Sequence, residues 1–383
     1  MITKKALFIF GTRPEAIKMA PIIQKFKINP NIQIKICVTG QHKEMLDSVL
    51  ELFDIVPDFN LDVMTPNQDL SNLTSKILLG LTNVYQNWKP DFVFVHGDTT
   101  TTFAASLSAY YHQIKIVHIE AGLRTGDICS PWPEEANRKL TGCLANIHFA
   151  PTELSRLNLL REGVKSENIF VTGNSVIDAL MQISNQIDSD LQLRTQLRQQ
   201  FPFLDYDQKF ILVTGHRREN FGEGFQRICK SLMQIAKLFP QVNIVYPVHL
   251  NPRVQKPVNE LLSGFNNIHL IPPVDYLPFI YLMKTTYFIL TDSGGIQEEA
   301  PSLGKPVLVM RDTTERLEAV NAGLVQLVGT DVDKIVRYAS ELLIDRDYYL
   351  RMSPAQNPYG DGNASERILN VILNVISAEQ KKK

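Results

Sequence analysis

The chain has 383 residues, of which 44% are hydrophobic, as is typical of a globular protein with two or three domains. Its 39 Lys and Arg nearly balance its 40 Asp and Glu, which excludes a large basic field for nucleic acid or an anionic membrane surface. No stretch approaches the ~18 to 20 apolar residues of a membrane span, and residues 6–10 predict a first strand rather than an export signal. A cytoplasmic location is therefore expected. The four scattered cysteines form no C-x-x-C pair, which argues against disulfides and a zinc site.

Short apolar runs alternate with longer amphipathic stretches, which is the pattern of parallel sheets with helical crossovers. Because the runs are hydrophobic throughout, helices are expected on both faces of each sheet. A polar, Gln-rich stretch around residues 183–208 separates two sets of runs. The expected strands are residues 6–10, 32–38, 92–95, 114–119 and 147–150, and then 210–213, 242–246, 268–271, 287–290 and 307–310. The sequence thus predicts an α/β fold with two Rossmann-like, doubly wound domains.

The division between these domains is expected near residue 172. Residues 1–172 would form the first domain and residues 173–362 the second. The last apolar-periodic segment, 363–380, has no strand after it and is expected to pack back on the first domain. Ligands in open α/β sheets lie beyond the carboxyl ends of the strands, so two such domains would face a central cleft lined by residues at those ends.

Two basic residues follow the first expected strand. Pro14 suits the first turn of a helix, and Gly11 permits a tight turn before it. Arg13 and Lys18 then lie near a helix N-terminus, where backbone N–H groups and the helix dipole favour an anion. These cations predict a phosphate site, with two solvated side chains on a helix as the alternative.

Three acids in the first half are candidates for catalysis. Asp98 follows the third expected strand, where N-capping of the next helix is the alternative role. Glu120 closes the fourth, and an acid has little structural reason to end an apolar strand there. Glu134 and Glu135 enter a helix after a proline-rich loop, and because adjacent acids point in different directions, at most one should face the cleft. We take Asp98, Glu120 and Glu134 as the candidates.

The second half places polar groups at two strand ends. His216 follows residues 210–213 and could bind phosphate, transfer a proton or be purely structural. Ser293, Gly294 and Gly295 have the shape of a diphosphate cradle, because glycine lets the backbone approach and a helix start supplies donors. Glu299 lies about one helical turn further on, within reach of ribose hydroxyls. A simple glycine turn is the alternative, and no complete G-x-G-x-x-G is present.

These features predict a nucleotide diphosphate bound between two domains, with carboxylates near the group attached to it. They do not choose a reaction. A glycosyltransferase, a nucleotide-sugar hydrolase, an epimerase and a non-catalytic nucleotide-sugar sensor would all satisfy them.

Five motifs spread over nearly the whole chain resemble those of the non-hydrolysing bacterial UDP-N-acetylglucosamine 2-epimerases. They are FGTRPEAIKMAP at 10–21, HGDTTTT at 96–102, HIEAGLR at 118–124, GHRRE at 215–219 and DSGGIQEEAP at 292–301. The resemblance implies the glycosyltransferase-B type of fold, no cofactor, a homodimer, and UDP binding by the second domain. It also implies conversion of UDP-N-acetylglucosamine to UDP-N-acetylmannosamine for surface polysaccharide synthesis. Related 2-epimerases acting on modified UDP-sugars, and the hydrolysing class, remain open.

The resemblance also assigns residues. The diphosphate would be held by Arg13, Lys18, Ser293, Gly294, Gly295 and Arg316, the ribose by Glu299, and uracil by Phe279 and the backbone of Val274. Asp98, Glu120 and Glu134 would transfer protons during elimination of UDP to 2-acetamidoglucal and its re-addition, with His216 assisting departure of UDP.

The chain departs from the family at several positions. Several relatives have Gln where Val274 stands, which matters little to a backbone contact. Leu317 stands where relatives often have a proline, directly after the arginine that matches Arg316. Some relatives are activated by a second substrate molecule. The matching region keeps Gln41 and Arg217 but has Glu44 and Asn67 where a Gln and an Arg would be expected, which argues against this activation.

Overall fold

A computed structural model describes residues 3–40, 43–65, 68–353 and 356–381. The chain divides into two compact units. Unit 1 comprises Met1–Ala179 and Tyr359–Lys383, and unit 2 comprises Leu180–Pro358. The chain passes out of unit 1 within one helix and returns just before the C-terminal helix.

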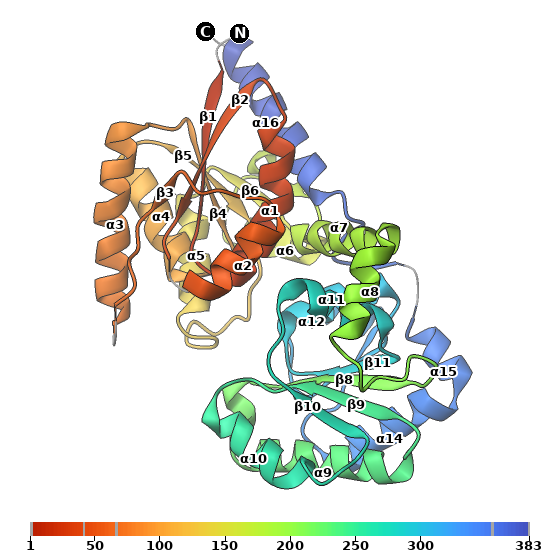
Figure 1. Cartoon of the computed structure of the whole chain (residues 1–383). Coiled ribbons are helices and arrows are strands. Elements are labelled where there is room, and N and C mark those ends of the chain that lie inside the picture. Colours follow the sequence, from red (N-terminus) through yellow and green to blue (C-terminus); the bar gives the residue numbers. More distant parts are fainter. Residues whose placement is uncertain (1–2, 41–42, 66–67, 354–355, 382–383) are drawn as a thin grey trace. The chain divides into compact units, whose positions relative to one another are not determined.

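Unit 1 is built on a parallel sheet whose described strands run in the order β3-β2-β1-β4-β5-β6-β7 (Figure 1). The strands are β1 (Lys4–Phe10), β2 (Ile32–Val38), β3 (Phe59–Asn60), β4 (Phe92–His96), β5 (Lys115–Ile119), β6 (Ile147–Ala150) and β7 (Ile169–Val171). The order reverses direction between β1 and β4. In doubly wound sheets this switch point is where ligands bind.

Helices cover both faces of this sheet, as the continuous apolar strands predict. They are α1 (Arg13–Lys27), α2 (Lys43–Leu52), α3 (Leu70–Asn87), α4 (Thr100–Tyr111), α5 (Glu134–Leu144), α6 (Glu153–Arg161), η1 (Ser166–Asn168), α7 (Ser175–Ser189) and α16 (Ala364–Lys381). Leu7 and Ile9 of β1 are buried in a cluster with α3 and α4. Phe8, between them in sequence, stacks on Phe94 and meets Phe26 of α1 on the opposite face. Alternate residues of one strand thus fill two separate cores.

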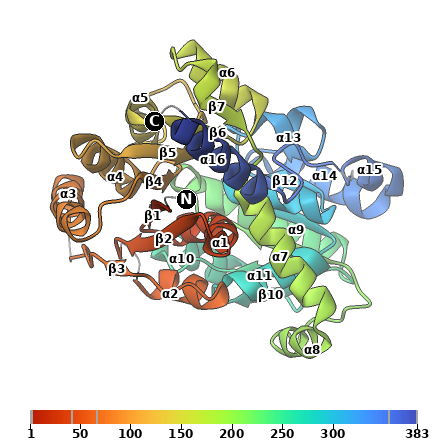
Figure 2. The same cartoon turned by 90° about the horizontal axis from the view of Figure 1, so that it is seen from above.

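The C-terminal segment belongs to unit 1. Helix α16 packs against α1, as both views show (Figures 1 and 2). Its first backbone N–H groups, from Ala364 and Ser365, donate to the buried Asp178 carboxylate at 3.1 and 2.7 Å. Asp178 therefore satisfies donors that the start of a helix leaves without a partner.

Unit 2 repeats the same topology, with strand order β10-β9-β8-β11-β12-β13. The strands are β8 (Phe210–Thr214), β9 (Asn243–Pro247), β10 (Ile268–Ile271), β11 (Phe288–Thr291), β12 (Val307–Val309) and β13 (Val325–Leu327). The helices are α8 (Leu191–Gln199), η2 (Arg218–Asn220), α9 (Glu223–Leu238), α10 (Pro252–Leu262), α11 (Tyr276–Thr285), α12 (Gly294–Glu299), η3 (Ala300–Leu303), α13 (Leu317–Asn321), α14 (Val332–Ile344) and α15 (Arg346–Arg351). Helices α9, α10 and α14 lie on one face and α11 and α12 on the other (Figure 1).

Two Rossmann-like, doubly wound units are the pair of folds that makes up the glycosyltransferase-B type, so the predicted fold class is confirmed. The expected strands all form, with ends shifted by a residue or two. The short strands β3, β7 and β13 were not predicted. Within the described residues, no helix is both long and apolar enough to cross a membrane.

Candidate active site

The candidate residues of unit 1 gather at the switch point of its sheet. Strands β4 and β5 are neighbours, with His96 opposite Ile119, so Asp98 and Glu120 follow adjacent strand ends. The Lys18 ammonium, from α1, forms an ion pair with the Glu120 carboxylate. The Glu120 side chain is only 8% exposed, so this pair is well shielded from water. Asp98 and Glu120 thus follow neighbouring strands, and Lys18 reaches Glu120 from the helix that follows β1.

The backbone at Glu120 has an unusual conformation. Its φ is 60°, in the left-handed region that residues with a Cβ rarely adopt. Gly122 follows with φ 93°, and a Cβ there would lie 2.2 Å from the carbonyl oxygen of Ser155. Only glycine fits this close approach, which explains the Gly of the HIEAGLR motif. Strained backbone of this kind is common at functional sites.

Two further side chains face Glu120. The amide Nδ2 of Asn174 donates to Glu120 Oε2 at 2.7 Å, and His96 Nε2 lies 3.9 Å from the same oxygen. Burial lowers the pKa of His96 to about 4, with Glu120 opposing this shift and Lys18 adding to it. His96 is therefore a neutral imidazole beside the carboxylate at neutral pH.

Asp98 is held by an arginine rather than by a helix. Its Oδ2 accepts from Arg138 Nε at 2.9 Å and Nη2 at 2.7 Å, and its backbone oxygen accepts from Asn137 at 2.9 Å. The N-cap of α4 is Thr99, whose hydroxyl accepts from the Thr102 N–H at 3.1 Å. The capping alternative for Asp98 is therefore wrong, and its carboxylate, 25% exposed, is available for chemistry.

The two adjacent acids at the start of α5 have different surroundings. Glu135 is fully buried, and it accepts from Arg138 at 3.0 Å and from two backbone N–H groups of the preceding loop. Glu134 is only partly buried. It lies three and four residues before Asn137 and Arg138, on the face of α5 that holds Asp98. Of the two acids, Glu134 is the more exposed.

A buried acid ties together two of the strand ends. The carboxylate of Glu15 accepts from the backbone N–H groups of Gly11 and Thr12 at 3.1 and 2.9 Å, and from the Thr99 hydroxyl at 2.7 Å. It links the turn that carries Arg13 to the turn that carries Asp98. Burial raises the pKa of Glu15, against these hydrogen bonds.

In unit 2, Asp292 has the same linking role between β8 and β11. It is fully buried and accepts from the backbone N–H groups of His216 at 3.0 Å and Arg217 at 2.9 Å. The His216 ring is 44% exposed and stacks on His249 with centroids 5.2 Å apart. Burial lowers the pKa of His216, Asp292 opposes the shift, and His249 and Arg217 add to it. Asp292 thus holds the backbone of His216 at the end of β8, while the ring stays partly exposed.

The predicted diphosphate cradle forms a strand, a turn and a short helix. Helix α12 begins at Gly294, with Ser293 as its N-cap. A Cβ on Gly294 would lie 2.9 Å from the guanidinium carbon of Arg316, whereas one on Gly295 would meet its nearest atom, on Glu299, at 3.5 Å. Arg316 therefore lies directly against the start of α12, and the simple glycine turn is not what forms here.

Arg316 is held in place by acids. Its Nε donates to Glu298 at 2.9 Å, and its Nη1 pairs with Glu315. Burial acts to raise the pKa of Glu315, but Arg316 and Arg311 outweigh it and hold that pKa at about 2. Both acids thus fix a buried guanidinium beside Gly294.

The residues assigned to ribose and uracil lie around α11. Glu299 is 8% exposed and accepts from the Tyr276 hydroxyl at 3.0 Å. Tyr276 and Phe279 are both on α11, and Val274 comes just before its N-cap, Asp275. The Tyr276 bond therefore joins the two segments on which the nucleoside residues were predicted.

The structure thus forms two clusters of predicted residues, one in each unit. Sequence reasoning missed the side chains that hold them, namely Asn174, Arg138, Asp292, Tyr276 and Glu298. Asp292 and Glu298 lay inside a recognised motif, but nothing local indicated their partners. Gln41 and Asn67 lie outside the described residues.

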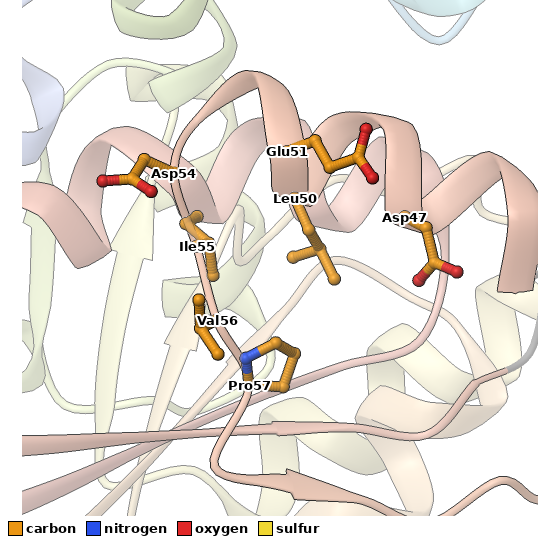
Figure 3. Close-up of a pocket in the computed structure, with 7 residues that line it drawn as sticks. All are labelled: Asp47, Leu50, Glu51, Asp54, Ile55, Val56 and Pro57. Atoms are coloured by element: carbon orange, nitrogen blue, oxygen red, sulfur yellow. The ribbon is translucent and has the colours of Figure 1, made fainter.

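A separate surface hollow lies in unit 1, beside the end of α2, and contains none of the predicted site residues (Figure 3). Apolar side chains group at its centre, and the acids lie around them. It is lined by Asp47, Leu50, Glu51, Asp54, Ile55, Val56 and Pro57.

Comparison with known proteins identifies the family. The model of the UDP-N-acetylglucosamine 2-epimerase family matches residues 24–373. The UDP-N-acetylglucosamine 2-epimerase of Yersinia pestis is 60% identical over 370 residues, which cover 97% of this chain and 98% of that protein.

Solved structures agree with this match. The UDP-GlcNAc 2-epimerase of Neisseria meningitidis, crystallised with UDP-GlcNAc, is 54% identical with a TM-score of 0.93, over 97% of this chain and 100% of that one. The enzyme of Methanocaldococcus jannaschii, in complex with UDP-GlcNAc and UDP, is 35% identical with a TM-score of 0.82, over 97% and 99%. The resemblance found in the motifs is thereby confirmed, and the chain belongs to the UDP-N-acetylglucosamine 2-epimerase family of enzymes.

Proposed function

We propose that this enzyme reversibly inverts C2 of UDP-N-acetylglucosamine to give UDP-N-acetylmannosamine, by elimination of UDP and its re-addition. The observation that carries the proposal is that Asp98 and Glu120 follow neighbouring strands of unit 1, with Lys18 paired to Glu120. The ligand of the Neisseria enzyme, UDP-GlcNAc, and those of the Methanocaldococcus enzyme, UDP-GlcNAc and UDP, support the substrate.

The low acidity of the C2 hydrogen of the sugar sets the order in which the bonds break. The C2 hydrogen is not next to a carbonyl, so a carboxylate cannot remove it unaided. As the C1–O bond breaks, UDP takes the electron pair and the sugar becomes oxocarbenium-like, which makes the C2 proton acidic. Arg13, His216 and the start of α12 supply fixed charges and dipoles for the departing diphosphate, the kind of preorganised stabilisation that is often the largest catalytic term.

Proton transfer falls to the carboxylates of unit 1. One of them takes the C2 proton, and the electrons of the C2–H bond form the C1–C2 double bond of 2-acetamidoglucal. On the return, this double bond takes a proton at the opposite face of C2 while the UDP oxygen attacks C1. Inversion needs acid–base groups on two faces, and Asp98, Glu120 and Glu134 come from three different segments.

Unit 2 would hold the nucleotide. Ser293, Gly294 and Gly295 present backbone groups to the diphosphate, and Arg316 adds a fixed positive charge at the same point. Glu299 would bind the ribose hydroxyls, while Phe279 and the backbone of Val274 would contact uracil. In the proposed cycle the glucal stays beside UDP between the two half-reactions.

The setting of the enzyme is also proposed. The resemblance to the family supports a cytoplasmic homodimer that acts without hydrolysis and supplies UDP-N-acetylmannosamine for surface polysaccharide synthesis. Light scattering of the purified chain should give twice its monomer mass, and a monomer mass at all concentrations would refute the dimer.

Product analysis tests the proposed reaction. Incubation of the purified enzyme with UDP-N-acetylglucosamine should give a stable mixture with UDP-N-acetylmannosamine, and the same mixture should form from either sugar. Net accumulation of free N-acetylmannosamine and UDP would instead assign the hydrolysing reaction. Turnover only with an added acceptor would assign a transferase.

A further inference from the structure

Asn174 lies between the proposed acid–base residue Glu120 and the place where the chain changes units. It follows β7 and directly precedes α7, the helix in which the chain leaves unit 1. Its side chain is buried, with 3% of the residue exposed. Its Nδ2 donates to Glu120 Oε2 at 2.7 Å, although the two residues are 54 positions apart in the chain.

The Asn174 amide has a fixed orientation. Its Oδ1 accepts from the backbone N–H of Val176 at 3.1 Å, so the oxygen is engaged by its own helix and the NH₂ group is turned to Glu120. An amide whose oxygen and nitrogen both have partners of the right kind holds one rotamer. The hydrogen bond to Glu120 is therefore specified by the local fold.

The backbone of Asn174 is in turn fixed by the returning chain. Its N–H donates to the Tyr359 carbonyl at 2.7 Å, where the chain re-enters unit 1. The neighbouring Gly173 has φ 88°, and a Cβ there would lie 3.3 Å from the Cα of Gly360 and from the Tyr359 oxygen. The outgoing and returning segments are thus in backbone contact, and Asn174 stands at that contact.

Among the described residues, Lys18, His96 and Asn174 all face Glu120, and they differ in what they can do. Lys18 from α1 donates a hydrogen bond to Glu120 Oε2 and adds charge from the end of a long, flexible side chain, and His96 from β4 lies 3.9 Å from that oxygen as a neutral ring. Asn174 supplies a directional donor from a buried, doubly anchored amide. A lysine donor on a flexible side chain can follow the carboxylate as it rotates, whereas a donor on an anchored amide selects one orientation.

We propose that Asn174 is a positioning residue, which orients the Glu120 carboxylate for proton transfer and connects that orientation to the crossing between the units. This inference rests on the proposed acid–base role of Glu120. Because the outgoing and returning segments of unit 1 are in contact at Asn174, its side chain links both segments to the Glu120 oxygen.

The test compares Asn174→Ala, Asn174→Asp and Ser175→Ala with the wild type, alone and combined with Glu120→Gln. Ser175 is the matched control, because it is the next residue, is buried, and has a hydroxyl with no hydrogen-bond partner among the described residues. Turnover and its pH profile are measured with UDP-N-acetylglucosamine. UDP affinity and Tm show whether each variant is folded.

Asn174→Ala should lower kcat by about tenfold or more, a part of the roughly 10²–10⁴-fold that general acid–base catalysis contributes. Its UDP affinity and the activity of Ser175→Ala should stay near wild type. Asn174→Ala removes a hydrogen-bond donor from the ionised Glu120 carboxylate, so the part of the pH profile that Glu120 sets should move to higher pH. Asn174→Asp places a second negative charge beside Glu120 and should move it further. In the Glu120→Gln background Asn174→Ala should have no further effect on kcat.

Three results would overturn the inference. If Asn174→Ala lowered kcat by the same factor in the wild-type and Glu120→Gln backgrounds, Asn174 would act independently of Glu120. Wild-type turnover for Asn174→Ala, with Glu120→Gln impaired, would refute the positioning role while leaving that of Glu120 intact. Wild-type turnover for Glu120→Gln would refute both together.

Discussion

At the scale of single residues, the candidate acids Asp98 and Glu120 of unit 1 are each paired with a cation. Arg138 donates twice to Asp98, and Lys18 pairs with Glu120. Each acid is thus paired with a cation from a different helix of the unit, α5 for Asp98 and α1 for Glu120.

Replacing either acid by its amide should separate chemistry from binding. Asp98→Asn and Glu120→Gln should each lower kcat by about 10²-fold or more, because a positioned acid–base group contributes roughly 10²–10⁴. UDP affinity, measured by calorimetric titration, should change little because the proposed nucleotide site lies in unit 2. Loss of UDP binding with normal turnover of bound substrate would show that these residues are not acid–base groups.

At the scale of elements, helix α12 is short, and its position depends on neighbours. Gln297 accepts from the Thr314 hydroxyl at 2.8 Å, and Ser293 N–H donates to the Thr291 hydroxyl at 2.9 Å. These bonds connect the helix to its own strand and to the segment that carries Arg316. The start of α12 and the guanidinium should consequently act as one anion site.

Two glycines at the start of α12 give a graded test of that site. Gly294→Ala should weaken UDP binding by at least about tenfold, since its Cβ would displace the Arg316 guanidinium, whose proposed bond to phosphate would contribute about 1.5–3 kcal/mol. Gly295→Ala should weaken it less, because its Cβ would make only an ordinary contact with Glu299, at 3.5 Å. UDP titration of both variants decides the order, and a reversed order would contradict the proposed site.

Element prediction from the sequence succeeded where the pattern was long. The apolar runs of β1, β2 and β4 mark buried parallel strands directly, whereas β3, β7 and β13 have two or three residues and too little pattern to detect. The capping role considered for Asp98 failed for a local reason. In the run Asp98-Thr99-Thr100 two successive residues are good N-caps, and the second one takes the position.

The positions of site residues could be predicted, but the partners that hold them could not. Asp98, Glu120 and Ser293 all follow strands, so their location at a sheet edge follows from topology. Their partners come from distant parts of the chain. Arg138 is 40 positions from Asp98, and Asp292 is 76 from His216, and such pairings depend on packing that no local pattern records.

At the scale of the whole molecule, three buried histidines lie on three neighbouring strands of the sheet of unit 1. His118 lies opposite His148 in the neighbouring strand, and His96 lies at the end of β4 next to them. Burial lowers their pKa values, to about 4 for His96, about 3 for His118 and about 4 for His148. Each is neutral in the folded chain at neutral pH.

These pKa values predict loss of stability in mild acid. Because the ordinary histidine pKa is about 6.5, the unfolded chain binds more protons than the folded one between about pH 4 and 6.5. The free energy of unfolding therefore falls as the pH is lowered through this window, by about 2 kcal/mol for His148 alone between pH 7 and 5.

Calorimetric Tm values from pH 7 to 5 check this. The Tm should fall with pH in the wild type, and His148→Gln should reduce the slope. Lys35→Gln, a change on the edge side of the sheet away from these histidines, serves as the control and should keep the wild-type slope. An identical slope in His148→Gln would show that this histidine does not titrate on unfolding.

The central claim is that C2 loses its hydrogen as a proton and regains one from the enzyme, and exchange with solvent tests it most directly. The enzyme is incubated with UDP-N-acetylglucosamine in deuterated water, and C2 is followed by NMR. The account predicts deuterium at C2 of UDP-N-acetylmannosamine and, as the reaction reverses, of UDP-N-acetylglucosamine too, with Asp98→Asn and Glu120→Gln strongly slowed. Formation of UDP-N-acetylmannosamine that keeps its original hydrogen at C2 would contradict it.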